Sequence, residues 1–118
     1  MDNLILEKSK AFAVRIVRLC QYLSAEKQEY ILSKQLLRSG TSVGANCREA
    51  SRAQSTADFV AKLNIALKEA DETAYWLELL KETNYIDEKQ FQSIHAGADE
   101  LIKILVSIIK TTKSKISN

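Results

Sequence analysis

Residues 55–82 read STADFVAKLNIALKEADETAYWLELLKE, and this run contains neither proline nor glycine. Apolar or small side chains recur in it every third or fourth residue, which is the period of an α-helix with one buried side. Ser55 or Thr56 is a suitable N-cap, and Asp58 places a negative charge in the first turn, where the helix dipole favours it. We therefore predict a helix that ends near residue 82 and buries Phe59, Leu63, Ala66, Ala70, Thr73, Leu77 and Leu80.

This helix also carries apolar side chains on a second side. Ile65, Trp76 and Leu79 lie there, on the same side as Lys62, Glu69 and Glu72. A helix with two apolar sides in a small protein often packs against a partner outside its own bundle. We therefore predict that Ile65, Trp76 and Leu79 lie in an interface between copies of the chain.

Three more helical segments flank this one. We expect the first over residues 3–23, a break at residues 24 and 25, and the second over residues 26–53. The last begins after Asp87, because Gln90 stands three residues later and completes a capping box. The 118-residue chain has no proline and only three glycines, which favours long helices. Short connections make neighbouring helices antiparallel, so residues 1–118 are expected to form one all-α domain, an up-down-up-down four-helix bundle.

The predicted buried sides of these helices follow the same spacing. They comprise Ile5, Ser9, Phe12, Ile16, Leu19 and Leu23, then Leu32, Leu36, Ser39, Val43, Asn46, Ala50 and Ala53, and finally Phe91, Ile94, Ala98, Leu101, Leu105 and Ile108. Small residues dominate the end of the second set, and they allow a neighbouring backbone to come close. The amide of Asn46 would need hydrogen-bond partners on this side, because an unpaired buried polar group costs stability.

An antiparallel pairing of the second and third helices fixes which residues meet. If the turn lies near residue 55, facing residues have numbers that sum to about 111. Glu49 should then approach Lys62, and Arg38 should approach Glu72 or Glu69. Partly buried ion pairs of this kind hold the register more than they add stability.

The two cysteines, Cys20 and Cys47, lie within helical patterns and not in a CxxC pair. The bundle would place them near opposite ends, beyond the roughly 7 Å between Cα atoms that a disulfide can span. We expect free thiols in a reducing cytoplasm. The chain starts without the basic and apolar regions of a secretory signal. Its longest strongly apolar stretch, residues 101–109, is about half a membrane span, so no membrane association is expected.

No motif of catalysis, metal binding or cofactor binding is present. His95 is the single histidine and is preceded three residues earlier by Gln92, so the Glu-x-x-His pair of di-iron bundles is missing. No Cys/His cluster has zinc spacing, and there is no glycine-rich phosphate loop. Glu69 and Glu72 share one helix side, but acid–base catalysis would also need a cleft and a polarised substrate. We expect a protein that is not an enzyme and uses no cofactor.

Charge is distributed unevenly although the net charge is only +2. Residues 1–56 hold nine basic and five acidic residues, whereas residues 57–102 hold four basic and ten acidic ones. On the first helix, Lys8, Arg15, Arg18 and Tyr22 follow one stripe, where the cations could neutralise phosphates and the ring could stack on a base. The same stripe is compatible with an ordinary solvated surface, and the charge segregation with pairing between helices.

Residues 38–50, RSGTSVGANCREA, resemble the second-helix signature of the 23S rRNA intervening-sequence protein family, which reads approximately Arg-Ser-x-x-Ser-Val/Ile-x-x-Asn-Ile-x-Glu-Gly/Ala. Cys47 replaces the commoner apolar residue and Ala50 the commoner glycine. The third helix is similar to that of the family as well, and the resemblance covers nearly the whole chain. The signature positions are Arg38, Ser42, Asn46, Glu49, Asp58, Phe59, Asn64, Lys68, Glu69, Glu72 and Trp76.

The resemblance implies a bacterial four-helix bundle with no associated catalytic activity. Its relatives include the accessory variability protein of diversity-generating retroelements, a basic homopentamer that binds nucleic acid and a reverse transcriptase. We therefore expect a homo-oligomer, with a pentamer as first choice, that binds structured RNA or DNA through the basic side of the first helix. The alternative is a scaffold that binds another protein and no nucleic acid. The acidic third helix and the side bearing Trp76 fit that alternative as well.

Overall fold

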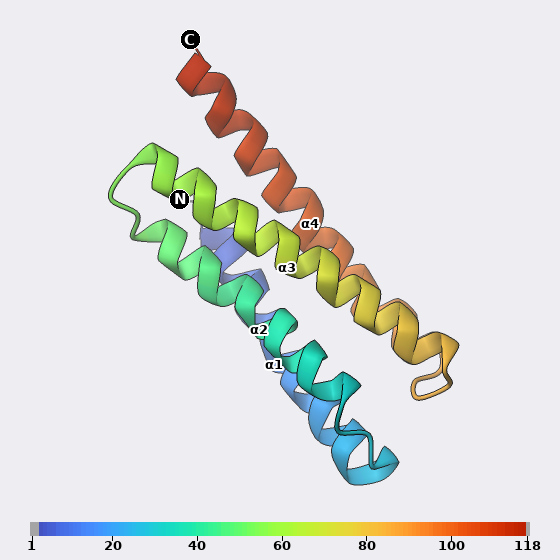
Figure 1. Cartoon of the computed structure of the whole chain (residues 1–118). Helices are drawn as coiled ribbons and strands as arrows, with labels where there is room; N and C mark the ends of the chain where they lie inside the picture. The colour runs from blue at the N-terminus through green and yellow to red at the C-terminus, as the bar shows by residue number, and fades with distance from the viewer. Residues whose placement is uncertain (1–2, 118) are drawn as a thin grey trace.

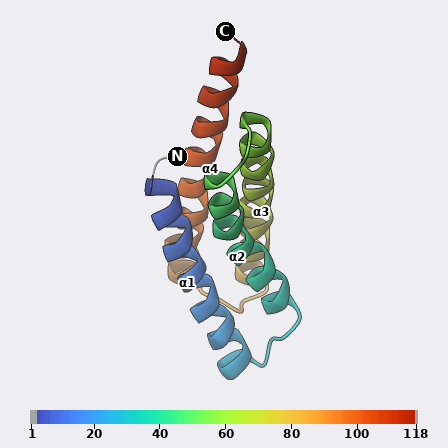
Figure 2. The same ribbon diagram turned by 90° about the vertical axis from the view of Figure 1, so that its left-hand side faces the viewer.

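The structure is a computed structural model that describes residues 3–117, so residues 1, 2 and 118 of the predicted domain lie outside it. The described chain forms α1 (Asn3–Lys27), α2 (Leu32–Ser51), α3 (Thr56–Glu82) and α4 (Glu88–Ser117), with no strand. Consecutive helices pack side by side with alternating direction, and α1 also contacts α4 (Figures 1 and 2). The predicted all-α, up-down-up-down bundle is confirmed. None of these helices is long and apolar enough to cross a membrane.

The starts of α3 and α4 use the predicted caps. The Ser55 hydroxyl accepts a hydrogen bond from the backbone N–H of Asp58 at 3.0 Å. At α4, Asp87 Oδ1 accepts from the Gln90 N–H at 2.7 Å, and Gln90 Oε1 accepts from the Asp87 N–H at 2.9 Å. These bonds satisfy N–H groups that have no partner within the helix.

The predicted boundary between α1 and α2 was wrong. The first helix continues to Lys27, and α2 begins only at Leu32. The buried carboxylate of Glu29 accepts the backbone N–H groups of Ile31, Leu32 and Ser33 at 2.8–3.0 Å, and so supplies the partners that the start of α2 lacks. The chain reverses at Gln28, whose φ of 50° lies in the left-handed region.

The core follows the predicted helix sides with four shifts of one residue, from Leu19, Leu32, Asn46 and Ile108 to Cys20, Ser33, Cys47 and Ile109. On α3, every predicted position from Leu63 to Leu80 is buried. On α1, Cys20 is buried and Leu19 only half-buried, and on α2 Cys47 is fully buried while Asn46 is half-buried. Each of these helices has neighbours on two sides and therefore buries an arc wider than one stripe. Both cysteines are free thiols, as predicted.

The backbones of α1 and α2 lie unusually close where α2 carries glycine. A Cβ added at Gly40 would lie 2.7 Å from Cγ2 of the buried Ile16, and one at Gly44 would lie 3.3 Å from the backbone oxygen of Ser9. Glycine is required at Gly40 because a packed, branched side chain occupies the space that any other residue would need.

The close approach at Gly40 predicts an inverted effect of alanine. In an unconstrained helix, Gly→Ala stabilises by roughly 0.5–1 kcal/mol. Here Gly40→Ala should lower the free energy of unfolding by about 1–3 kcal/mol, because it overpacks the core. Urea denaturation of the native protein, Gly40→Ala, Ile16→Ala and the double variant measures this effect. In the Ile16→Ala background, the added methyl group should stabilise. A gain of stability in the native background would contradict the described approach.

Candidate functional site

The basic stripe predicted on α1 faces α4, and most of it is occupied by contacts within the chain. Lys8 Nζ lies 3.0 Å from Glu100 Oε1, and Arg15 donates to the hydroxyl and the carbonyl oxygen of Ser93 at 2.7 and 3.3 Å. Tyr22 is half-buried against the core. Arg18 is exposed and forms no ion pair or hydrogen bond in the described part of the chain. The four residues therefore lie on one side of α1, and Arg18 is the one cation among them whose side chain has no described contact.

Arg15 and Arg18 border a groove between α1 and α4 with a volume of about 330 Å³. Gln90 and Ser93 of α4 also line it, and the half-buried Leu19 is among its apolar lining residues. The amide and hydroxyl groups can donate or accept hydrogen bonds beside the two guanidinium groups. This arrangement suits a ligand with negatively charged oxygens better than an apolar one.

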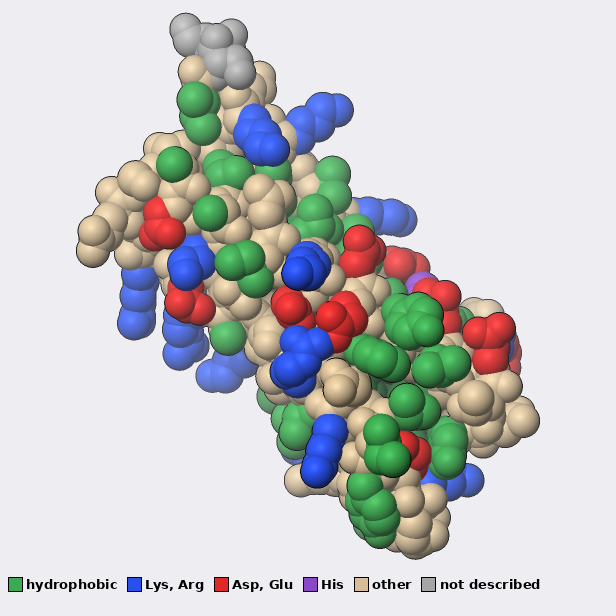
Figure 3. Space-filling view, viewed as in Figure 1, with side chains coloured by type: hydrophobic (Ala, Val, Ile, Leu, Met, Phe, Trp, Pro, Cys, Tyr) green, Lys and Arg blue, Asp and Glu red, His purple; other side chains and the backbone are tan. Residues whose placement is uncertain are grey.

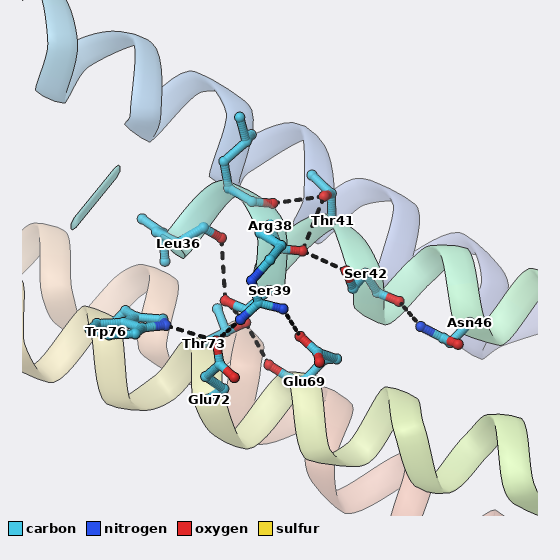
Figure 4. A network of polar contacts seen from close by, with 11 residues as sticks. Leu36, Arg38, Ser39, Thr41, Ser42, Asn46, Glu69, Glu72, Thr73 and Trp76 are labelled. Atoms are coloured by element: carbon cyan, nitrogen blue, oxygen red, sulfur yellow. Dashed lines mark hydrogen bonds and ion pairs between the residues drawn. The ribbon is translucent and has the colours of Figure 1, made fainter. Parts of the chain in front are cut away.

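The family-signature residues of α2 and α3 form a polar cluster across the contact of these helices (Figure 4). Arg38 binds Glu69 Oε2 at 3.0 Å through one nitrogen and pairs with Glu72 through another. Trp76 donates its indole N–H to Glu72 at 3.1 Å. The predicted register is confirmed, since Glu49 also lies 3.6 Å from Lys62.

Beneath this cluster, two buried hydroxyl groups join the helices. Thr73 donates from its hydroxyl at 2.9 Å to that of Ser39, or to the backbone oxygen of Glu69 at 2.7 Å (Figure 4). Both side chains are fully buried. Each hydroxyl also has a backbone acceptor in its own helix, so a shift of α2 along α3 would cost only the hydrogen bond between the two hydroxyls, about 0.5–1.5 kcal/mol.

The remaining signature residues have local contacts. Asn46 donates its amide to the backbone oxygen of Ser42 at 2.8 Å, and Ser42 donates to that of Arg38 at 2.6 Å. Phe59 packs half-buried against the core. Asn64 and Lys68 are exposed and form no described hydrogen bond or ion pair. The signature therefore reports mainly on how α2 and α3 pair, and not on a site of chemistry.

The residues predicted for an interface between copies are only partly exposed. Ile65 is 42% exposed, while Trp76 and Leu79 are half-buried. Tyr75, beside Trp76, is exposed, and its ring meets that of Trp76 edge to face at 5.2 Å between centroids. Figure 3 shows hydrophobic side chains gathered over the first half of α2 and the second half of α3.

Sequence reasoning missed a second groove, which lies on the other side of α1. It runs between α1, the C-terminal half of α2 and the start of α3, with a volume of about 1040 Å³. Lys10, Arg48 and Arg52 line it. The four-residue spacing of the two arginines could have indicated a shared helix side. Their position beside Lys10 depends on how α1 crosses α2.

Titratable groups do not assemble into a reaction centre in the described part of the chain. Burial raises the pKa of Cys20 to about 11, and the nearby Glu29 carboxylate adds to this effect. Burial also raises the pKa of Cys47 to about 11, against a smaller lowering by its hydrogen bond with Ser9. Both thiols are thus protonated and unreactive at neutral pH. His95 contacts Glu78 at 3.2 Å and Asp99 at 3.3 Å, and the described residues form no group of metal ligands.

Comparisons with known proteins agree with this structure. A family model described as 23S rRNA-intervening sequence protein matches residues 1–107. The chain is also similar to a crystal structure of a protein of unknown function from the S23 ribosomal protein family of Bacteroides thetaiotaomicron, with 59% sequence identity and a TM-score of 0.89. That similarity covers 90% of this chain and 98% of the other. No curated protein matches the chain.

Proposed function

Since this chain belongs to the 23S rRNA-intervening sequence protein family, we propose that it is a non-enzymatic, homo-oligomeric accessory protein that binds structured RNA through the basic side of its bundle. The proposal places it in the bacterial cytoplasm, where its two reduced cysteines are stable. Neither the family model nor the similar crystal structure is described by a catalytic activity, which supports a binding role.

The observation that carries RNA binding is the set of cations without acidic partners on α1 and α2. Lys10, Arg18, Lys27, Lys34, Arg48 and Arg52 are exposed and form no described ion pair. Ten of the 15 acidic residues lie in residues 57–102, which include α3 after Thr56 and the first half of α4. The first two helices therefore carry positive charge that the fold does not neutralise, and such a surface attracts phosphate groups.

A scaffold for a protein partner is the second candidate function. The hydrophobic side chains over α2 and α3, with Trp76 and Tyr75 among them, favour it, because aromatic residues are enriched in protein interfaces. The two functions differ in one measurable respect. A scaffold of this kind would show no RNA affinity at physiological salt, whereas the primary proposal requires it.

Reversing the charge of Arg15 and Arg18 should reduce affinity for a structured rRNA fragment at least about tenfold, because phosphates would then meet carboxylates. Fluorescence polarisation measures the affinity, and circular dichroism verifies that the bundle stays folded. A control variant, Lys68→Glu with Lys103→Glu, changes the net charge equally on α3 and α4 and should bind more tightly than Arg15→Glu with Arg18→Glu. Equal affinities for the two variants would contradict binding at this side of α1, and no binding by the native protein would refute RNA binding altogether.

The proposed oligomer rests on the apolar side of α3. Light scattering should return a multiple of the 13.3 kDa chain mass at micromolar concentration, with five copies as the first expectation. Ile65→Glu should lower that mass without unfolding the chain, since Ile65 is 42% exposed and its substitution leaves the monomer core intact. Asn64→Glu introduces the same charge one residue away and is the matched control. A native mass of one chain would contradict the proposal.

A further inference from the structure

The groove between α1 and α2 combines unpaired charge with an accessible surface. Lys10 lines it from α1, Arg48 from the last turn of α2, and Arg52 from the C-cap position directly after that helix. All three side chains are exposed, and none forms an ion pair or hydrogen bond in the described chain. Figure 3 shows Lys and Arg side chains projecting together from the edge beside the C-terminal half of α2.

Two carboxylates line the same groove and reduce its charge only in part. Glu49 lies 3.6 Å from Lys62, which is also a lining residue, so this pair is neutral overall. Asp58 stands in the first turn of α3, where the positive end of the helix dipole offsets its charge. Lys10, Arg48 and Arg52 therefore leave an excess of positive charge.

Small residues of α1 and α2 are among those that line the groove. Ala13, Gly44 and Ala45 line it, and a Cβ added at Gly44 would lie 3.3 Å from the backbone oxygen of Ser9. Small side chains do not fill the groove, so an extended ligand can lie in it between the flanking cations. Arg48 lies in the last turn of α2, and Arg52 is the residue at its C-cap, four positions further along the chain. They can thus meet successive negative groups of one extended chain.

The lining chemistry favours nucleic acid over an acidic protein segment. Leu6, which is half-buried, is the one large apolar side chain among the described lining residues. Protein interfaces draw most of their energy from apolar and aromatic residues in desolvated pockets. Interfaces with nucleic acid are more polar and much more positively charged. A guanidinium group also matches the geometry of a phosphate with two parallel hydrogen bonds.

We propose that the groove between α1 and α2 binds the phosphodiester backbone of RNA, with Lys10, Arg48 and Arg52 as the phosphate contacts. This inference rests on the proposed function and names a second contact region, on the side of α1 opposite the groove that Arg15 and Arg18 border. RNA would then contact two sides of α1, whereas a single row of cations on that helix faces only one side.

The test replaces Arg48 and Arg52 with glutamine and titrates a structured rRNA fragment. We expect at least about a tenfold loss of affinity at 100 mM salt, and a salt slope that is shallower by about two, because two phosphate contacts disappear. Arg48→Lys with Arg52→Lys should keep the salt slope, because the charge remains, and should lose less affinity than the glutamine variant. Lys68→Gln with Lys103→Gln removes the same charge elsewhere and should change the affinity by less than about threefold. Unchanged circular dichroism and urea midpoints exclude unfolding, since both arginines are exposed.

Each outcome separates this inference from the proposed function. Suppose that the native protein binds RNA, and that Arg48→Gln with Arg52→Gln has the same affinity and salt slope as the control Lys68→Gln with Lys103→Gln. The groove then does not contact RNA, and the inference alone is wrong. That result would leave an acidic protein partner as the occupant of the groove. If the native protein binds no RNA at low salt, both the proposed function and the inference fail.

Discussion

The close approach of α1 and α2 at Gly40 and Gly44 is the constraint on which the rest of the structure depends. It brings the α2 backbone against Ile16 and Ser9, so α2 cannot rotate without driving its backbone into a packed side chain. This contact directs Ser39 and Val43 into the core and leaves Arg48 and Arg52 on the outer edge. The position of the basic groove therefore depends on the close packing of α1 and α2. Gly44 permits this packing and also lines the groove.

The second constraint is polar and acts between α2 and α3. Arg38 binds two carboxylates of α3, and the buried hydroxyls of Ser39 and Thr73 meet one layer below. Arg38 is about half exposed, so its ion pairs contribute little net stability. A shifted register would break the hydrogen bond between the two buried hydroxyls. This arrangement accounts for the family signature without assigning it any chemistry.

The features that were predicted correctly are those determined by residues close together in the sequence. The cap at Ser55, the capping box of Asp87 and Gln90, and the buried side of α3 are all set by residues within one helix. The start of α2 could not be predicted in this way, because Glu29 acts there through a buried carboxylate in a tertiary environment, whereas Ser, Thr, Asp and Asn are the usual caps. The basic stripe of α1 was located correctly, but the engagement of Lys8 with Glu100 and of Arg15 with Ser93 depends on which helix packs beside it. The groove at Arg48 arises from a helix crossing, which no periodicity reveals.

The central claim is that cations left unpaired by the fold bind RNA phosphates. The most direct test is the salt dependence of the affinity of the unaltered protein for a structured rRNA fragment. Because each neutralised phosphate contributes about 0.7–0.9 to the slope, Lys10, Arg18, Arg48 and Arg52 together predict that log K falls linearly with log salt with a slope of about −3 or steeper. An affinity that does not change between low and physiological salt, or no binding at low salt, would contradict the account.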